Sequence, residues 1–493
     1  TRPSSAARDP FWWFALAMAG LWVLVPALIN PGQVGDHFEQ FTWAHSMEWG
    51  YHKHPPLPTW LLAITLKWVA ATPYATYGVA ALMLAGTALF TWLLARELLG
   101  ARLASLAIVL WGLHWSFSWK GQMLNHNSVM MCCIAAAAWL ALQASRRQMG
   151  SIWILRWWLG LGLVGGLAML TKYQSAIPLV GVIIALWRAG HLHERDKLLG
   201  LLMAVSVALA VFAPHVLWVV NHDFVTLKYA SSTVQQLDML GRVRKLLSFS
   251  ALQLRMLLWP LLCIGVLARW MRKTPAAASV DGAANERERQ AWLLGLLGWP
   301  LVVLAVLCLA QGVRLQDHWG FQSMQFVSLW LAWQLRRFGP QAATRLLVLA
   351  LVTHTLGLVT YSRSVWDPRT LAKRERPDQF YPAQTLAGAV MLSWKQATSC
   401  PLRYVVGGTY EAGMVSVYSG QNPVVFETAS LERSPWVDLA DLTRAGAVYV
   451  YSQVPEQLPG PLPLHRLAFT LPGGEKSLYD VYWAVVAPTD SCR

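Results

Sequence analysis

An acidic residue, Asp36, opens the segment of this sequence whose side chains are best suited to chemistry. The segment reads GDHFEQFTWAHSMEWGYHKHPPLPTW over residues 35–60. A carboxylate such as Asp36 can act as a general base or bind a divalent metal ion. The spacing Asp36-x-x-Glu39 also matches a capping box at the start of an amphipathic helix over residues 37–49. Both interpretations stay open, because a capping side chain is also an oriented one.

Basic residues suited to holding a phosphate occur later in the chain. Lys172 ends an apolar run, where an ionisable residue is a functional candidate, although its side chain would equally reach lipid headgroups. Arg242, Arg244 and Lys245 form a cluster that would bind a phosphate or an anionic lipid, or else simply contact headgroups. These residues are candidates for stabilising negative charge rather than for proton transfer.

Histidines add further candidates. His318 and Trp319 follow Asp317 and are expected to line the same site. His52 and His54 offer imidazole ligands to a metal, but they also belong to a rigid turn that Pro55 and Pro56 impose on the chain. The sequence contains no zinc-ligand spacing, P-loop or Rossmann fingerprint.

Composition identifies the environment in which these residues must be positioned. The chain has 493 residues, of which 55% are hydrophobic and 13% charged, with a mean hydropathy of +0.38. Soluble domains carry about a quarter charged residues, so a soluble globular protein, a disordered chain and a coiled coil are excluded. The long unalternated apolar runs are typical of membrane helices rather than of barrel strands. The fold class is therefore an α-helical polytopic membrane protein.

Eleven spans are predicted from the apolar runs: 11–29, 77–95, 103–119, 128–144, 153–170, 174–187, 198–219, 250–268, 291–310, 320–335 and 344–361. With a cytoplasmic N-terminus, every loop on the inner side is basic: 96–102, 145–152, 188–197, 269–290 and 336–343. The net charge of +15 is explained by this asymmetry, so no nucleic-acid partner is inferred. Membrane lipids are the expected surroundings.

One apolar run, 56–71, is better placed at the outer interface than across the membrane. It is short and follows a proline-rich turn, and a twelfth span here would move most basic loops to the outside. Residues 30–76 then form one long outer loop that contains interfacial helices. The other outer segments are 119–128, 171–174, 220–249, 311–319 and everything after about residue 362, and the polar residues cluster on this outer side.

The chain after residue 362 differs in kind. Short β-like runs (RYVVGG, VSVYSG, NPVVFE and AVYVYS) and a helix near 437–445 predict a small α/β domain over 363–493, after a transmembrane domain over 1–362. Cys400 and Cys492 are the two cysteines of this domain, and an oxidising compartment would let them form a disulfide. The alternative is a pair of free buried thiols.

The first loop resembles one known family specifically. Asp36 and the later WAHSMEWGYHKHPPL are similar to the bacterial glycosyltransferase family 39, of GT-C architecture, whose relatives include protein O-mannosyltransferases and lipid A aminoarabinose transferases. The matching residues are Trp49, Gly50, Tyr51, His54, Pro55, Pro56 and Leu57. Further similar segments are Arg96–Arg102, Leu170–Tyr173, Asn221–Asp223 and His318-Trp319, so the resemblance covers about residues 10–335.

The resemblance implies an inverting transfer of a sugar from a polyprenyl (undecaprenyl) phosphate carrier to a periplasmic acceptor at the bacterial inner membrane. Asp36 is then the catalytic residue, and the donor phosphate is held by Lys172, the 242–245 cluster, Tyr51 and His54. The substrate site would be lined by His37, Glu39, Asn125, Asn127, His222, His318 and Trp319.

The sequence departs from the family pattern at two acidic positions. The second acid of the first loop is His37 here, and the acid after the third span aligns with Asn127, or alternatively Asn125. A bound divalent ion such as Mg²⁺ or Mn²⁺ at Asp36 is therefore doubtful, because hard cations prefer several carboxylate oxygens.

The outer basic residues favour an anionic lipid acceptor such as lipid A or lipopolysaccharide. A protein acceptor within the same family is the alternative. A transporter or flippase for lipid-linked or anionic solutes is a further one, although the sequence shows no inverted repeat and no charge near mid-membrane of the kind that transporters use.

Overall fold

The computed structural model describes residues 9–32, 34–147, 152–232, 237–271, 286–367, 378–470 and 479–489. These residues divide into two compact units. The helical unit comprises Thr1–Val25, Ala80–Gln122 and His126–Tyr361. The mixed unit comprises Pro26–Val79, Met123–Asn125 and Ser362–Arg493, so it contains both the first predicted outer loop and the C-terminal segment. Whether 1–362 and 363–493 are separate domains stays a prediction.

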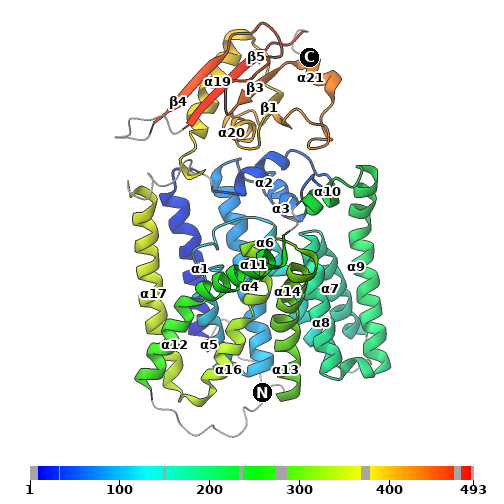
Figure 1. Cartoon of the computed structure of the whole chain (residues 1–493), viewed down its shortest axis with the longest axis vertical. Coiled ribbons are helices and arrows are strands. Elements are labelled where there is room, and N and C mark those ends of the chain that lie inside the picture. Colours follow the sequence, from blue (N-terminus) through cyan, green and yellow to red (C-terminus); the bar gives the residue numbers. More distant parts are fainter. Residues whose placement is uncertain are drawn as a thin grey trace. The chain divides into compact units, whose positions relative to one another are not determined.

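The chain is mostly helical, as predicted (Figure 1). Its longer elements are α1 (Pro10–Ile29), α4 (Pro73–Leu99), α5 (Ala101–Gly112), α6 (His126–Ser145), α7 (Ile152–Met169), α8 (Ala176–Arg188), α9 (Arg195–Asn221), α10 (Val225–Ser232), α11 (Met239–Met256), α12 (Leu258–Trp270), α13 (Glu286–Leu293), α14 (Trp299–Gln311), α16 (Val327–Gln334) and α17 (Gln341–Trp366). Shorter turns are η2 (Tyr173–Ser175), η3 (His191–His193), η4 (Leu294–Gly298), η5 (Asp317–Gly320), α15 (Phe321–Met324) and η6 (Leu335–Arg337).

Among the described residues, six helices are long and apolar enough to cross a membrane, and the bent pair α11 and α12 would make a seventh. The six are Pro10–Ile29, Pro73–Leu99, His126–Ser145, Arg195–Asn221, Glu286–Gln311 and Gln341–Trp366. Leu202, Leu209 and Leu217 of α9 are exposed, as expected for side chains that face lipid. The chain therefore has several apolar spans.

Three predicted spans differ from straight helices. The span 103–119 was predicted too long, because α5 ends at Gly112. The span 250–268 is broken at Leu257, where α11 and α12 meet at a bend of 54°. Pro260 explains this break: it has no amide hydrogen and its ring would clash with the Met256 carbonyl four residues earlier. That carbonyl instead accepts a hydrogen bond from the Trp115 amide at 3.4 Å. The third, 320–335, is interrupted between α15 and α16.

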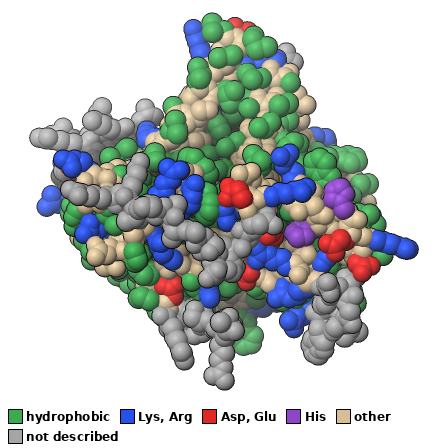
Figure 2. Space-filling view, turned by 90° about the horizontal axis from the view of Figure 1, so that it is seen from below, with side chains coloured by type: hydrophobic (Ala, Val, Ile, Leu, Met, Phe, Trp, Pro, Cys, Tyr) green, Lys and Arg blue, Asp and Glu red, His purple; other side chains and the backbone are tan. Residues whose placement is uncertain are grey.

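The loops predicted to share one side of the membrane do lie together within the helical unit. Arg146 at the end of α6 pairs with Glu97 of α4 at 2.8 Å and with Glu288 of α13 at 3.1 Å. His191, after α8, is 3.5 Å from the same Glu288. Figure 2 shows Lys and Arg side chains gathered on the face that is seen from below. The loops near residues 97, 146, 191 and 288 therefore lie together, while the number of spans and the side of the membrane stay predictions.

Glycine residues allow the closest helix packing in the helical unit. A Cβ on Gly162 of α7 would lie 2.5 Å from the Ala204 carbonyl of α9, and one on Gly166 would lie 2.6 Å from the Val211 Cβ. Small residues at helix contacts are typical of membrane proteins, where packing rather than the hydrophobic effect joins the helices.

The mixed unit contains a five-stranded sheet with the order β2-β1-β3-β5-β4. Its elements are α2 (His37–Trp43), α3 (Leu57–Thr65), η7 (Asp378–Phe380), α19 (Ala383–Ala397), β1 (Tyr404–Gly407), α20 (Glu411–Tyr418), β2 (Val424–Glu427), α21 (Leu439–Ala445), β3 (Ala447–Tyr451), β4 (His465–Phe469) and β5 (Tyr479–Val486). Strand β1 is parallel to both β2 and β3, whereas β5 is antiparallel to β3 and β4. The α/β character predicted for the C-terminal segment is therefore observed.

Two local predictions were wrong. Most of the run VSVYSG (415–420) belongs to α20, which ends at Tyr418, rather than to a strand. The helix was missed because nearly all of its side chains are buried, so its polar and apolar residues do not alternate with a helical period. The helix predicted over 37–49 ends at Trp43.

The run 56–71 contains α3, whose nine residues rise about 14 Å. As predicted, α3 is therefore too short to span a hydrocarbon core of about 30 Å.

Candidate functional site

Asp36 is an exposed carboxylate at the start of α2, in the mixed unit. It occupies the N-cap position, but its side chain makes no capping hydrogen bond to the described backbone. Its Oδ2 instead accepts a hydrogen bond of 2.9 Å from the Asn125 amide. The capping interpretation of Asp36 is therefore wrong: an amide 89 residues away in sequence orients this carboxylate.

Glu39 lies one turn further along α2 and pairs with a lysine that sequence reasoning missed. The Lys53 Nζ is 2.5 Å from the Glu39 Oε2. Burial raises the pKa of Glu39 to about 7, even though the Lys53 ammonium lowers it; Asp36 and Glu427 add to the rise. Glu39 therefore titrates close to neutral pH.

The other predicted residues of the first loop mainly support this arrangement. His37 is buried, and its Nε2 accepts a hydrogen bond of 2.9 Å from the Leu124 amide, so its Nδ1 donates to Thr76 at 3.1 Å. Tyr51 is completely buried and donates its hydroxyl to the Ser46 carbonyl at 2.5 Å. His54 closes the turn through reciprocal backbone hydrogen bonds with Tyr51.

Lys172, Asn127 and His318 come together in the helical unit. The Lys172 Nζ donates to the Asn127 Oδ1 at 3.1 Å. Burial, followed by the positive charges of Lys172 and Lys120, lowers the pKa of His318 to about 3. His318 is therefore neutral at physiological pH in a positively charged environment. The neighbouring Trp319 accepts a hydrogen bond of 3.1 Å on its carbonyl from Gln174.

The basic cluster 242–245 lies in α11 rather than in a loop, which corrects the prediction. Arg242 donates to the Leu309 and Ala310 carbonyls at 2.8 and 3.0 Å, so it satisfies the C-terminus of α14. Arg244 is exposed and Lys245 is half-buried. His222 stacks on Trp218 at the end of α9 with ring centroids 4.0 Å apart.

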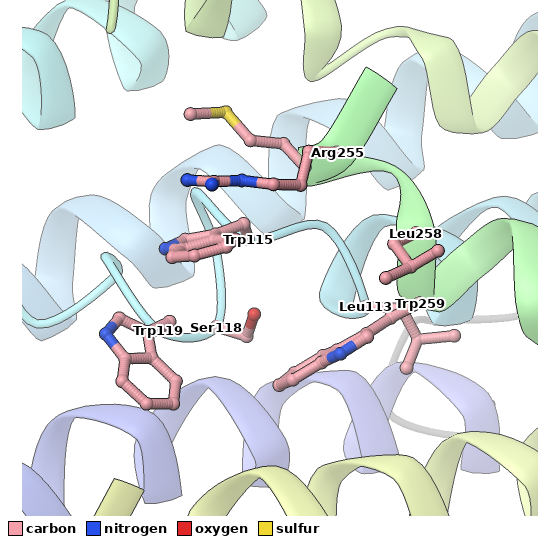
Figure 3. A pocket seen from close by; sticks show the side chains of 8 residues that line it. Leu113, Trp115, Ser118, Trp119, Arg255, Leu258 and Trp259 are labelled. Carbon is pink, nitrogen blue, oxygen red and sulfur yellow. The ribbon is translucent and has the colours of Figure 1, made fainter. Parts of the chain in front are cut away.

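Sequence reasoning also missed Arg255, which lines an apolar cavity in the helical unit (Figure 3). The cavity has a volume of about 330 Å³. Its lining residues are Leu113, Trp115, Ser118, Trp119, Arg255, Met256, Leu258 and Trp259. The Arg255 guanidinium stacks above the Trp115 ring with its carbon 5.4 Å from the ring centroid. Arg255 is exposed and forms no ion pair with a described residue. A charge inside the apolar run 250–268 was the available signal.

Two asparagines that lie two positions apart in the chain hold the main charged candidates. Asn125 binds Asp36, and Asn127 binds Lys172. The sequence aligned one family acid with either Asn127 or Asn125, and each of the two has a polar partner. In the same mixed unit as Asp36, Cys400 is disulfide-bonded. Its predicted partner Cys492 lies outside the described residues, so that pairing stays a prediction.

Comparison with known proteins gives three findings. Residues 53–218 match the family described as dolichyl-phosphate-mannose-protein mannosyltransferase. The lipid A galacturonosyltransferase RgtD of Rhizobium johnstonii is 26% identical over 284 residues, which cover 55% of this chain and 54% of RgtD. The chain thus spans about half the length of this curated relative.

The fold is similar to that of ArnT from Cupriavidus metallidurans. The apo structure superposes with a TM-score of 0.64 at 14% identity and covers 98% of this chain and 99% of ArnT. The structure of ArnT bound to undecaprenyl phosphate gives a TM-score of 0.58 at 14% identity, covering 98% and 100%. The fold prediction is therefore confirmed as far as a mostly helical, ArnT-like fold. This chain therefore has an ArnT-like fold, and its residues 53–218 match a mannosyltransferase family.

Proposed function

We propose that this protein transfers one sugar, with inversion, from a polyprenyl phosphate carrier to an anionic lipid such as lipid A at the outer face of the bacterial inner membrane. The observation that carries the proposal is the state of Asp36, an exposed carboxylate oriented by Asn125 and not used as a cap. Attack of a hydroxyl on an anomeric carbon needs such a base. The name of RgtD, a lipid A galacturonosyltransferase, supports a lipid acceptor, and the undecaprenyl phosphate bound to ArnT supports a polyprenyl phosphate carrier.

The cavity beside Arg255 is the proposed binding site for the carrier. Its walls are mainly aromatic and aliphatic side chains, which suit a prenyl tail. Arg255 supplies a positive charge at the same cavity, and a guanidinium binds phosphate through several donors. A phosphate is already a good leaving group, so charge stabilisation matters more here than an acid.

Lys172 is proposed to stabilise the phosphate as the sugar leaves. Asn127 holds its ammonium at 3.1 Å, and neutral His318 lies in the field of the same lysine. Tyr51 and His54 are proposed to act indirectly, by holding the turn that contains Lys53, because the Tyr51 hydroxyl is already bonded to Ser46. Arg242 donates to carbonyls of α14 and is proposed to fix α11 in place. Arg244 and Lys245 of the same helix are proposed to bind an anionic lipid.

We further propose a topology of eleven spans with a cytoplasmic N-terminus, so that the C-terminal α/β segment is periplasmic. The clustering of the basic loops at one end of the helical unit supports this orientation. A periplasmic location also suits the disulfide at Cys400.

We expect transfer to proceed without a divalent metal at Asp36. Hard cations prefer several carboxylate oxygens, but Glu39 is paired with Lys53, and His37 already bonds Leu124 and Thr76. Removing metals with EDTA should change the rate less than about twofold. Loss of a catalytic metal would lower the rate far more, because such a metal stabilises the transition state by several kcal/mol. A large loss that Mg²⁺ or Mn²⁺ restores would contradict this expectation.

Transfer should fall as the pH decreases through about 7, the pKa of Glu39. Protonation of Glu39 removes the negative charge that holds Lys53. Because a half-buried ion pair contributes ~0.5–1 kcal/mol, we expect the transfer rate to fall about two- to fivefold. His45 and His52 do not contribute between pH 6 and 8, because burial lowers the pKa of each to about 4. The rate should be measured from pH 6 to 8 for wild type and Glu39→Gln. The variant should show the low rate at every pH, and an unchanged pH profile would assign the titration to another group.

Reconstitution tests the reaction itself. The purified chain in lipid vesicles is given undecaprenyl phosphate-linked galacturonic acid, the sugar in the name of RgtD, and then other undecaprenyl phosphate-linked sugars. Lipid A is the acceptor. The expected result is a lipid A mass that increases by one sugar, with equimolar release of undecaprenyl phosphate. Release of the carrier only when a serine- and threonine-containing peptide replaces lipid A would overturn the lipid acceptor and favour protein glycosylation.

A further inference from the structure

Helix α2, which follows Asp36 directly, cannot hold its own conformation. It has seven residues, whereas isolated helices shorter than about 12 residues are marginal in water. Its stability must come from packing, and six of its seven residues are buried. The position of Asp36 is therefore set by the surface against which α2 packs.

That surface is α20 of the C-terminal segment, and the two helices meet at a glycine. A Cβ on Gly413 would lie 2.2 Å from the Thr42 Oγ1 and 3.5 Å from the Thr42 Cβ. The Thr42 hydroxyl is held at 3.0 Å from the Thr409 carbonyl, immediately before α20. No side chain larger than hydrogen fits at position 413 while Thr42 stays in place.

Further contacts fix both ends of α2 on the same segment. Phe38 stacks on Tyr410 with ring centroids 4.3 Å apart and planes 27° apart. At the other end, Trp43 donates its indole hydrogen to the Glu427 Oε2 at 3.2 Å, and Glu427 also accepts from the Thr409 hydroxyl at 2.7 Å. Glu427 is 1% exposed, so this carboxylate has little access to water and depends on these donors and on Arg433, whose Nη1 lies 3.4 Å from its Oε1.

The C-terminal segment also reaches the residues around Asp36. The Gly35 amide, next to Asp36 in the chain, donates to the Asp378 Oδ2 at 3.2 Å. The pKa of the Tyr410 phenol is raised by burial and then by the negative charges of Asp378, Asp36 and Glu39. The start of α20 therefore lies near the carboxylates of the first loop.

We propose that α20 of the C-terminal segment positions the catalytic carboxylate, with Gly413 and Thr42 as the positioning residues. The inference rests on the proposed role of Asp36 as the base. It gives the C-terminal segment a direct part in the reaction: it is the platform on which the first loop is built. Transfer therefore requires the close approach of α2 to α20.

Three variants of the full-length protein test this proposal in the reconstituted transfer assay. Gly413→Ala must displace Thr42 by about 1 Å to reach ordinary contact, and a misplacement of that size lowers a rate by as much as about 10²-fold. Thr42→Ala removes the hydroxyl that blocks position 413 and should change kcat by less than about fivefold, the effect of one hydrogen bond. Thr42→Ala/Gly413→Ala should recover most of the activity that Gly413→Ala loses. Gly388→Ala in α19 is the matched control, because nothing lies within 4 Å of its Cβ.

A positioning role predicts two further results that a general loss of folding would not give. The KM for the lipid-linked donor should stay within about twofold in Gly413→Ala while kcat falls, as expected when only transition-state interactions are lost. Hydrogen exchange of peptides that cover residues 36–45 should be faster in Gly413→Ala and should return to the wild-type rate in the double variant.

These measurements test the proposed function and the positioning role of α20 separately. If wild type shows no transfer, the proposed function fails, and the exchange data still decide whether α20 holds α2. If wild type transfers but Gly413→Ala keeps the wild-type kcat and exchange rate, the positioning role is overturned. A loss in Gly413→Ala that the double variant does not restore also overturns it.

Discussion

Replacing Asp36 with asparagine should reduce sugar transfer at least about 10²-fold, the lower bound for loss of a general base. Asparagine has nearly the same size and shape as aspartate, but it cannot accept a proton from the attacking hydroxyl. Its oxygen can still accept the hydrogen bond from Asn125 that orients position 36. The loss should therefore appear in kcat, and the measurement is the rate of carrier release from a saturating lipid-linked donor.

Asp238→Asn is the matched control. The Asp238 side chain is a genuine cap, since its Oδ1 accepts a hydrogen bond of 2.9 Å from the Gly241 amide at the start of α11. Asparagine caps a helix about as well as aspartate, so this variant should retain full activity. Equal retention of activity in Asp36→Asn would show that the carboxylate of Asp36 takes no part in the chemistry.

Replacing Arg255 with methionine should be the second most damaging change. It keeps a flexible apolar side chain but removes the guanidinium, which lies over Trp115 and supplies the positive charge at the cavity. A hydrogen bond to a charged group contributes about 1.5–3 kcal/mol, so kcat/KM for the lipid-linked donor should fall about 10- to 100-fold. Binding of undecaprenyl phosphate alone should weaken by a similar factor, which can be measured without any turnover.

Arg345→Met provides the comparison for Arg255. Arg345 also lies over a tryptophan, with its guanidinium carbon 4.8 Å from the Trp270 ring, but it lines no part of the cavity. Its loss should leave donor binding unchanged. If both variants weaken binding equally, the effect comes from the loss of an arginine–tryptophan contact and not from the cavity.

The long apolar helices were predictable because their signal is local. Runs such as Pro10–Ile29 and Gln341–Trp366 need only about 20 apolar residues to be recognised. Loops that were predicted to share one side do lie together, as the contacts of Arg146 with Glu97 and Glu288 indicate, while the orientation stays a prediction. The bend between α11 and α12 was also present in the sequence, at Pro260, but hydropathy does not register a proline within an apolar run.

The site was harder to predict because its partners are distant in sequence. Asp36 was identified as a candidate, yet its local spacing favoured a capping box that the structure does not form. Asn125 was predicted to line the site, but its hydrogen bond to Asp36 follows only from the fold. Helix α20 was missed for a related reason, since a helix buried on most sides has no polar face to reveal its period.

Mass spectrometry of total lipid and lipopolysaccharide tests the central claim most directly, using cells that carry wild type, Asp36→Asn or no protein. The account predicts one lipid or lipopolysaccharide species whose mass increases by a single sugar only with wild type. A sugar added equally by Asp36→Asn would contradict the role of Asp36. The absence of any sugar-dependent difference in lipid would contradict the lipid acceptor and direct attention to protein acceptors, and then to transport of the lipid-linked substrate.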